Sequence, residues 1–271
     1  MTKTLIVNMD KCIACYNCVV ACKDEFVDND WSPYSKPQGE KHFWMKLNRI
    51  ERGDWPKLKV SHMPIPCVQC EDAPCEKQAK SGAIYKRSDG IVIIDPVKSI
   101  GQNQLVSSCP YGAIYWNKEL NIPQKCTFCA HLLDRGWQEM PRCVKACPVE
   151  ALTFGEYENL KQTIQDMKAT PLSPELNTKP RTYYIGLPKT FIAGTLIDQK
   201  NGDCLSGAEI SVKETTSGAT LTTKSDYLGE FLVDGLESKK TYEVTITKPS
   251  TTPMKKTVTL DKDTYLGEIT L

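Results

Sequence analysis

The sequence predicts an α+β protein in two parts, a cysteine-rich part to about residue 155 and an antiparallel β-sandwich or barrel from residue 190. Three observations predict this division. The length of 271 residues suggests about two domains. Of the 13 cysteines, 12 lie between Cys12 and Cys147, and Cys204 alone lies beyond them. From Phe191 onward, short runs alternate between apolar and polar residues and are separated by turn residues, as in strands.

Charge and hydropathy exclude several classes of protein. The 34 Lys and Arg nearly balance the 33 Asp and Glu, and no basic run stands out, so we expect no nucleic-acid partner. No run of about 18 apolar residues is present, so we expect no direct membrane span. Residues 1–8 become polar too early for the apolar core of a signal peptide, and the expected location is cytoplasmic. In that reducing compartment, so many cysteines indicate metal rather than disulfides.

The cysteines fall into four groups. The first, from Cys12 to Cys22, has the spacing C-x2-C-x2-C-x3-C of a bacterial ferredoxin. In that arrangement three closely spaced thiolates bind one 4Fe–4S cluster, and the fourth cysteine binds the neighbouring cluster. The other groups are Cys67-x2-Cys70-x4-Cys75, then Cys109 before Pro110, and finally Cys126-x2-Cys129-x13-Cys143-x3-Cys147 before Pro148.

Zinc is the alternative metal for such groups. Zinc sites usually take two close pairs of ligands, often with histidine. This chain instead repeats closely spaced triplets and Cys-Pro, and its three histidines, His42, His62 and His131, are expected to have packing or hydrogen-bonding roles. The pattern therefore favours iron–sulfur clusters.

An internal repeat sets the register of the groups. The residues after Cys109-Pro110 (111–115, Tyr-Gly-Ala-Ile-Tyr) resemble those at 81–85 (Ser-Gly-Ala-Ile-Tyr) and at 149–153 (Val-Glu-Ala-Leu-Thr). By this alignment Ala79 stands where a terminal cysteine is expected. Counting back from Cys109 gives the places of a missing triplet, which are Ser99, Gln102 and Leu105.

The chain therefore follows a plan of four ferredoxin motifs in which four ligand positions hold no cysteine. In each pair of motifs, the triplet of one motif and the fourth cysteine of the other bind the same cluster. If motif one pairs with motif four and motif two with motif three, the four positions without cysteine all belong to a single cluster. Random loss of four cysteines would usually leave incomplete ligand sets on several clusters. Here the remaining twelve cysteines form three complete sets, which predicts three 4Fe–4S clusters. Cluster A takes Cys12, Cys15, Cys18 and Cys147, cluster B takes Cys22, Cys126, Cys129 and Cys143, and cluster C takes Cys67, Cys70, Cys75 and Cys109.

The segment after the last motif predicts a helix and then a linker. Residues 156–170 carry apolar residues at helical spacing, namely Leu160, Ile164 and Met167. The following prolines end this helix. We thus expect a cluster-binding domain at 1–155 with an insert at 26–66, a helix and irregular linker at 156–189, and a β-domain at 190–271.

The β-domain resembles the transthyretin-like, carboxypeptidase-regulatory type of β-sandwich. The resemblance lies in Gly194–Asp198, Leu205–Ile210 and Thr222–Phe231, and it predicts six or seven short strands. Alternating strands are expected at 210–213, 242–247 and 258–260, with a turn at Asp234-Gly235. Many functions share this fold, so the resemblance predicts architecture alone. Cys204 has no companion ligand and is expected to have no metal role.

The four motifs, together with 178–184 after the last one, resemble the iron–sulfur subunit of the molybdopterin oxidoreductases of dimethyl-sulfoxide-reductase type. The resemblance covers residues 1–189 and implies two interleaved bacterial-ferredoxin-like units. It also implies a heterodimer with a large catalytic subunit that holds molybdenum or tungsten on two pterin guanine dinucleotides. This chain would transfer electrons, and none of its residues would be catalytic.

Two features of the cysteine-rich part have more than one interpretation. The insert carries Trp31, Phe43, Trp44 and Trp55, which would either dock the large subunit or cover the clusters within this chain. Five lysines lie beside ligands or the missing triplet, and they either raise cluster potentials or are solvated surface charges. They are Lys11, Lys23, Lys98, Lys125 and Lys145.

Overall fold

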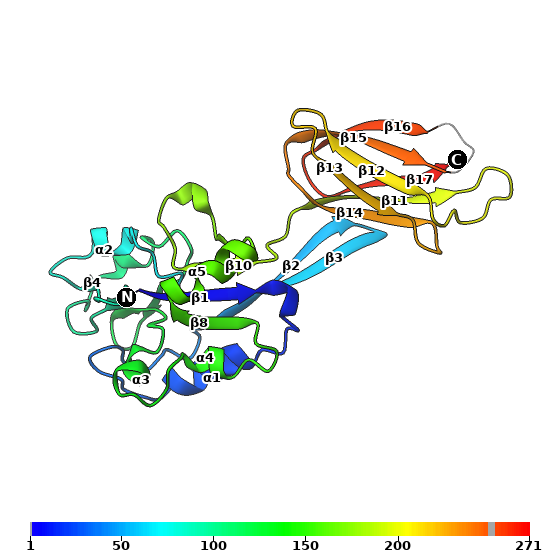
Figure 1. The fold of residues 1–271 in the computed structure, drawn as a ribbon. Coiled ribbons are helices and arrows are strands. Elements are labelled where there is room, and N and C mark those ends of the chain that lie inside the picture. Colours follow the sequence, from blue (N-terminus) through cyan, green and yellow to red (C-terminus); the bar gives the residue numbers. More distant parts are fainter. Residues whose placement is uncertain (1, 249–252) are drawn as a thin grey trace. The chain divides into compact units, whose positions relative to one another are not determined.

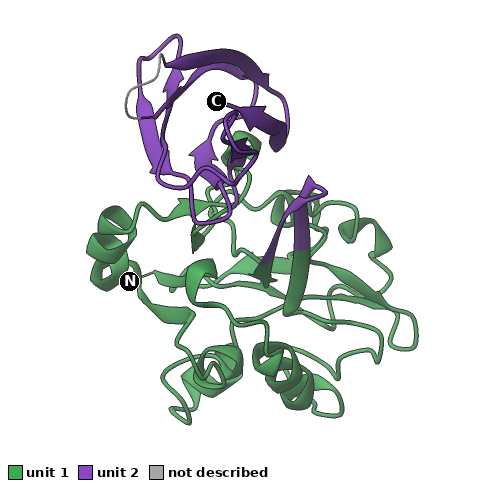
Figure 2. Ribbon diagram, turned by 90° about the vertical axis from the view of Figure 1, so that its right-hand side faces the viewer, with its two compact units in different colours: residues 1–49, 62–187 green, residues 50–61, 188–271 purple. Residues whose placement is uncertain are grey.

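The computed structural model describes residues 2–248 and 253–271. The chain forms two compact units, one of residues 1–49 and 62–187, the other of residues 50–61 and 188–271 (Figure 2). The first unit therefore extends beyond residue 155, and a short piece of the expected insert belongs to the second.

A four-stranded sheet organises the first unit (Figure 1). Its strand order is β8 (Leu152–Glu156), β1 (Lys3–Asn8), β10 (Thr182–Ile185) and β9 (Thr170–Pro171). β1 runs antiparallel to β8 and parallel to β10. The two ends of the cysteine-rich part thus meet in one sheet, which holds the first and last motifs together.

The helix expected at 156–170 is present but shorter: α5 spans Tyr157–Asp166. Its Ile164 packs with Ile6 and Ile185 of the sheet, while Met167 lies beyond the helix and is exposed. The linker expected at 171–189 is less irregular than predicted, because β10 lies within it. β10 has only four residues, which are too few to predict a strand from the sequence pattern. Its pairing partner is β1, which is far away in the sequence.

Short helices and hairpins make up the rest of the first unit. Helix α1 (Asn17–Phe26) packs against α4 (Arg142–Lys145), again joining the first motif to the last. The other elements are η1 (Met9–Lys11), α2 (Pro74–Gln78), β4 (Ile84–Lys86), β5 (Val92–Ile94), η2 (Asn103–Leu105), β6 (Tyr115–Asn117), β7 (Ile122–Gln124), α3 (Ala130–Asp134) and η3 (Pro174–Leu176).

The second unit is a β-sandwich with seven strands in its described residues. One sheet has the order β14 (Glu230–Leu236), β11 (Thr190–Ile197), β17 (Thr264–Thr270). The other has the order β13 (Thr220–Lys224), β12 (Glu209–Glu214), β15 (Lys240–Thr247), β16 (Met254–Leu260). Ile192, Leu196, Ile210, Val212 and Val244 form much of the core between them.

Two details of the sandwich differ from the sequence prediction. β17 pairs with β11 in parallel, so the sandwich is not wholly antiparallel. Alternation of polar and apolar residues fixes which face of a strand is buried, but it carries no information about strand direction. The turn expected at Asp234-Gly235 is instead a bulge inside β14, where the register shifts and Gly235 has a φ of 91°.

A long hairpin consists of β2 (Lys46–Asp54) and β3 (Lys57–Ile65). Its tip, residues 50–61, belongs to the second unit, and the rest of the hairpin belongs to the first (Figure 2). Within the second unit, its tip forms ion pairs with the sandwich. Arg52 Nη1 lies 3.3 Å from Asp263 Oδ1, and Lys59 Nζ lies 2.5 Å from Asp234 Oδ2. Basic side chains of the tip therefore form ion pairs with acidic side chains of the β-domain.

Over residues 2–248 and 253–271, no helix combines the length and the apolar composition needed to cross a bilayer.

Candidate metal centres

The loops that carry the cysteine pairs share a backbone kink. The residue before the second cysteine has a positive φ in each: 57° at Ala14, 51° at Gln69 and 50° at Phe128. Left-handed backbone is unusual for residues other than glycine, so its recurrence marks one shared turn. The missing triplet keeps that turn, because Gly101 occupies the equivalent place with a φ of 76°.

The first set of cysteines combines the N-terminal triplet with a residue from the last motif. Cys12, Cys15, Cys18 and Cys147 line one cavity, whose other walls include Leu47 and Pro64. Burial raises the pKa of the Cys18 thiol to about 11, and the nearby Cys12 and Cys147 add to the shift. Four sulfurs from segments far apart in sequence thus face one space.

The second set lines another cavity and consists of Cys67, Cys70, Cys75 and Cys109. Burial raises the pKa of Cys70 to about 12, reinforced by Cys67, while a hydrogen bond with Thr178 opposes the shift. Apart from the cysteines, the lining residues are apolar or aromatic except for Lys125.

The third set lies between α1, α3 and α4 and is fully enclosed. Cys22, Cys126, Cys129 and Cys143 are all buried. Burial raises the pKa of Cys22 well above its usual value, and proximity to Cys126 and Cys129 raises it further. Cys143 responds in the same way to burial and then to Cys129, Cys22 and Cys126. Cys22 is therefore close to Cys126 and Cys129 of the last motif as well as to Cys18 of the first triplet.

These donor sets fit an iron–sulfur cluster chemically. A buried thiol with a raised pKa does not ionise at neutral pH by itself, but coordination to a metal deprotonates it. Four thiolates facing one cavity would also repel each other unless cationic iron lay between them. In the described part of the chain, no three His, Cys, Asp or Glu side chains converge as a single metal ion would require. The cysteines surround cavities instead.

The four positions without cysteine meet at one place. Gln102 Nε2 donates to the Lys80 carbonyl at 3.2 Å and to the Lys98 carbonyl at 2.8 Å. Leu105 is completely buried, and Ala79 packs against the same apolar cluster. Ser99 is also buried. Side chains and hydrogen bonds therefore occupy the region where the repeat predicts a fourth cluster.

The residues after each terminal cysteine confirm the internal repeat. Ala113 N donates to Cys109 Sγ at 3.4 Å, and Ala151 N donates to Cys147 Sγ at 3.2 Å. At the third copy no sulfur is present, and Ala83 N donates to the Lys80 carbonyl at 3.0 Å instead. A left-handed residue stands at the same place in each copy, namely Gly82, Gly112 and Glu150, while the acceptor has changed.

Of the five lysines near the motifs, Lys125 alone is buried, with 2% of its surface exposed. Lys11 and Lys145 are exposed, as is Lys98, and Lys23 is held by the carbonyls of Gly39, Glu40 and His42. Sequence reasoning missed Gln69, which is 1% exposed and hydrogen-bonded to the Cys126 carbonyl at 3.0 Å. Its place between two cysteines was the available signal.

Some aromatic residues of the insert cover the cysteine-rich core, and others are exposed and available to dock another subunit. Trp44 is buried against Phe26, and Trp31 stacks on His131 with ring centroids 4.4 Å apart, so these two cover the cysteine-rich core. Trp55 is 84% exposed and Phe43 is also exposed. His131 is buried and hydrogen-bonds to Glu25 at 2.9 Å, which agrees with the expected structural role.

Two family models match the chain. A 4Fe-4S dicluster domain matches residues 58–157, and a carboxypeptidase regulatory-like domain matches residues 191–271. The first match includes the second, third and fourth cysteine groups, and the N-terminal triplet lies outside it. The two models support a ferredoxin-like domain followed by a transthyretin-like β-domain.

Several curated proteins are similar to this chain. The pyrogallol hydroxytransferase small subunit of Pelobacter acidigallici is 37% identical over 98% of this chain and 98% of its own length. A sulfite dehydrogenase subunit of Allochromatium vinosum is 33% identical over 69% of this chain and 83% of its own. Among solved structures, 5-hydroxyisourate hydrolase of Klebsiella pneumoniae covers 30% of this chain and 90% of its own, with 14% identity and a TM-score of 0.26.

Proposed function

Since this chain belongs to the family of iron–sulfur subunits of the dimethyl-sulfoxide-reductase type of molybdopterin oxidoreductases, we propose that it carries three 4Fe–4S clusters for a large catalytic partner. The partner would hold molybdenum or tungsten on two pterin guanine dinucleotides, in a heterodimer. Bound to the cysteines, the clusters supply one-electron transfer, and this chain supplies their position and electrostatic surroundings.

The observation that carries the proposal is the assembly of each cysteine set from two distant motifs. Cys147 lines the same cavity as the N-terminal triplet, and Cys109 lines the same cavity as the second triplet. This supports two interleaved ferredoxin-like units with the expected ligands. Cluster A would be held by Cys12, Cys15, Cys18 and Cys147, cluster B by Cys22, Cys126, Cys129 and Cys143, and cluster C by Cys67, Cys70, Cys75 and Cys109.

Iron and acid-labile sulfide analysis of the purified complex tests the number of clusters. Three 4Fe–4S clusters require about 12 iron atoms in this chain, after subtraction of any iron in the partner. A count of about 16 would mean that Ala79, Ser99, Gln102 and Leu105 do not mark a lost cluster. A count of about 8 would mean that one of the three cysteine sets does not bind one.

For the partner's reaction, we propose hydroxyl transfer between polyphenols such as pyrogallol and phloroglucinol. The full-length similarity to the pyrogallol hydroxytransferase small subunit supports this, because it includes the appended β-domain. Three runs of the chain also resemble that transhydroxylase subunit, namely Asp89–Pro96, Cys109–Gly112 and Gln124–Asp134. The alternative is a reductive phenol or catechol dehydroxylase, or another molybdopterin oxidoreductase.

A steady-state assay separates these two reactions. Moving a hydroxyl from one polyphenol to another involves no net redox change, whereas removing it consumes electrons. Turnover of polyphenols by the complex without an external electron donor supports transhydroxylation. Turnover that stops without a donor supports the dehydroxylase.

The missing fourth set suggests that electrons do not leave through this chain to a distant acceptor. Leu105 and Gln102 occupy the place that would hold the next cluster. We infer that the three clusters exchange electrons mainly with the partner's metal and buffer its oxidation state. Fast reduction of the complex by a membrane quinol would contradict this inference.

A free polyferredoxin is the less favoured function, and purification without a heavy partner would support it. The exposed Trp55 and Phe43 instead support docking to another subunit. We propose a cytoplasmic location for the complex, since its cysteines would stay reduced there.

A further inference from the structure

Four buried groups form a closed ring of hydrogen bonds between the second and third cysteine sets. Val92 N donates to Gln69 Oε1 at 2.9 Å, and Gln69 Nε2 donates to the Cys126 carbonyl at 3.0 Å. The ammonium of Lys125 donates to that same carbonyl at 3.1 Å and to the carbonyl of Val92. Each member therefore fixes the position of its neighbours.

The ring joins two loops that hold different cysteine sets. Gln69 lies between Cys67 and Cys70, which face one cavity. Lys125 directly precedes Cys126, which belongs to the other set, yet its side chain lines the Cys67 cavity. Lys125 thus lies in the loop of Cys126, while it lines the cavity of the Cys67 set.

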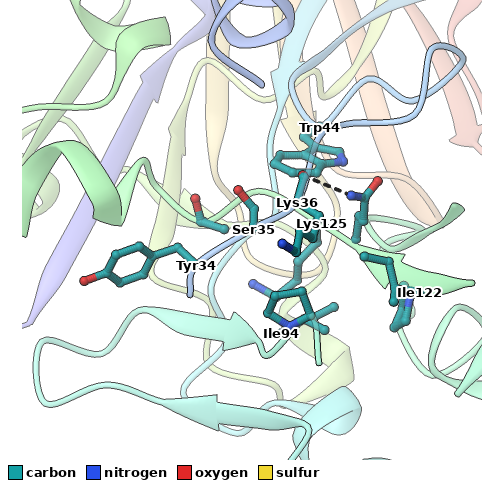
Figure 3. Close-up of a pocket in the computed structure, with 11 residues that line it drawn as sticks. Tyr34, Ser35, Lys36, Trp44, Ile94, Ile122 and Lys125 are labelled. Carbon is teal, nitrogen blue, oxygen red and sulfur yellow. Dashed lines mark hydrogen bonds between the residues drawn. The ribbon is translucent and has the colours of Figure 1, made fainter. Parts of the chain in front are cut away.

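Lys125 is a buried cation without a carboxylate partner. It also lines a second pocket together with Trp44 and Ile94 (Figure 3). Among the described residues no Asp or Glu forms an ion pair with it, and two carbonyls are its hydrogen-bond acceptors. A buried charge is unfavourable unless it is compensated. The thiolates of the neighbouring cysteine sets are the negative charge available to it.

Lys125 lies next to both cysteine sets. It lines the cavity of Cys67, Cys70, Cys75 and Cys109, and its ammonium donates to the carbonyl of Cys126. A fixed positive charge at this place favours negative charge in both sets.

We propose that Lys125, held in place by Gln69, is a positioning residue that raises the reduction potentials of the groups bound by the Cys67 and Cys126 sets. The inference rests on the proposed function, because it presupposes 4Fe–4S clusters there. Reduction adds one negative charge, and a fixed cation in a dry interior favours the more negative state. Lys125 lines the cavity of the cluster C ligands, so we expect the effect to be largest at cluster C.

The test is a redox titration of the purified complex followed by electron paramagnetic resonance. Lys125→Gln keeps amide donors for both carbonyls and removes the charge. We expect the equilibrium constant for reduction of cluster C to fall at least about tenfold, which is about 59 mV for one electron.

Lys11→Gln is the matched control. Lys11 directly precedes Cys12, as Lys125 precedes Cys126, but it is exposed to solvent. Water and salt screen an exposed charge, so all three potentials should change less than about twofold in equilibrium constant. Gln69→Glu is a second, near-isosteric variant that replaces the amide donor to the Cys126 carbonyl with a carboxylate oxygen, and the added negative charge should lower the potential of cluster C in the same direction.

The outcomes separate this inference from the proposed function. Wild-type complex without 4Fe–4S signals would contradict the proposed function itself. Wild-type complex with about 12 irons, and either variant with full iron but unchanged potentials, would overturn only the role of Lys125. Loss of iron from both variants would also overturn it, because the ring would then hold the clusters instead of tuning them.

Discussion

Gln102 and Lys80 pair in both directions: Gln102 Nε2 donates to the Lys80 carbonyl at 3.2 Å, and Lys80 N donates to Gln102 Oε1 at 3.0 Å. Gln102 stands at a position of the missing triplet, and Lys80 directly follows Ala79, the missing fourth ligand. The two segments that would share a cluster are therefore still joined, by an amide side chain instead of iron.

This relationship predicts that the lost ligands can be restored. The variant with Ala79→Cys, Ser99→Cys, Gln102→Cys and Leu105→Cys should gain a fourth cluster, because the left-handed turn at Gly101 is retained. Iron analysis should rise from about 12 to about 16. Gln102→Cys alone is the control and should gain no iron. A fourfold variant that stays at about 12 irons would show that the backbone no longer fits a cluster.

Leu105 fills this region and should contribute to stability. It is completely buried in an apolar cluster with Ile84, Ile94 and Ile114. Leu105→Ala removes buried methyl groups and leaves a cavity, so the free energy of unfolding should fall by about 2–4 kcal/mol. Thermal melting measures this, with cluster absorbance as a check on iron content. Leu120→Ala, at a more exposed leucine nearby in sequence, should change little, and an equal effect of both would contradict the account.

Two ion pairs of the hairpin tip in the second unit should differ in strength. Arg52 is largely buried, bonds Asp263 at 3.3 Å and lies over the ring of Phe191. Arg52→Met leaves Asp263 without this partner and should destabilise the second unit by about 2–3 kcal/mol. Lys262→Met breaks the exposed pair with Asp54 and should cost about 0–0.5 kcal/mol. Proteolysis within 188–271 measures both, and equal susceptibility would contradict the prediction.

The sequence predicted the local features well. Gly-Ala-Ile-Tyr at 82–85 and 112–115 and the similar Glu-Ala-Leu-Thr at 150–153 located the copies of the repeat, and Ala113 and Ala151 donate to the preceding terminal cysteine in the same way. The strands expected at 210–213, 242–247 and 258–260 lie within β12, β15 and β16. These predictions succeeded because spacing and alternation are local properties of the chain.

The features that escaped prediction depend on distant partners. β10 is a strand because β1 lies beside it, and β17 is parallel to β11 because of how the chain returns between the two sheets. Lys125 looked like four other lysines in sequence, and its burial follows from the packing of Trp44 and Ile94 around it. Gly101 and Gln69 were signals that a local reading could have found, the first as a glycine at the kink of the lost triplet and the second as the residue between two cysteines.

The pairing of Cys22 with the last motif tests the account most directly, because sequence proximity alone would assign it to the first triplet. Iron is measured in Cys22→Ala, in Cys22→Ala with Cys143→Ala, and in Cys22→Ala with Cys12→Ala. If Cys22 and Cys143 serve one cluster, the first two variants both keep about 8 irons and the third keeps about 4. About 4 irons in the Cys22→Ala, Cys143→Ala variant, with about 8 in the Cys22→Ala, Cys12→Ala variant, would contradict the interleaved arrangement.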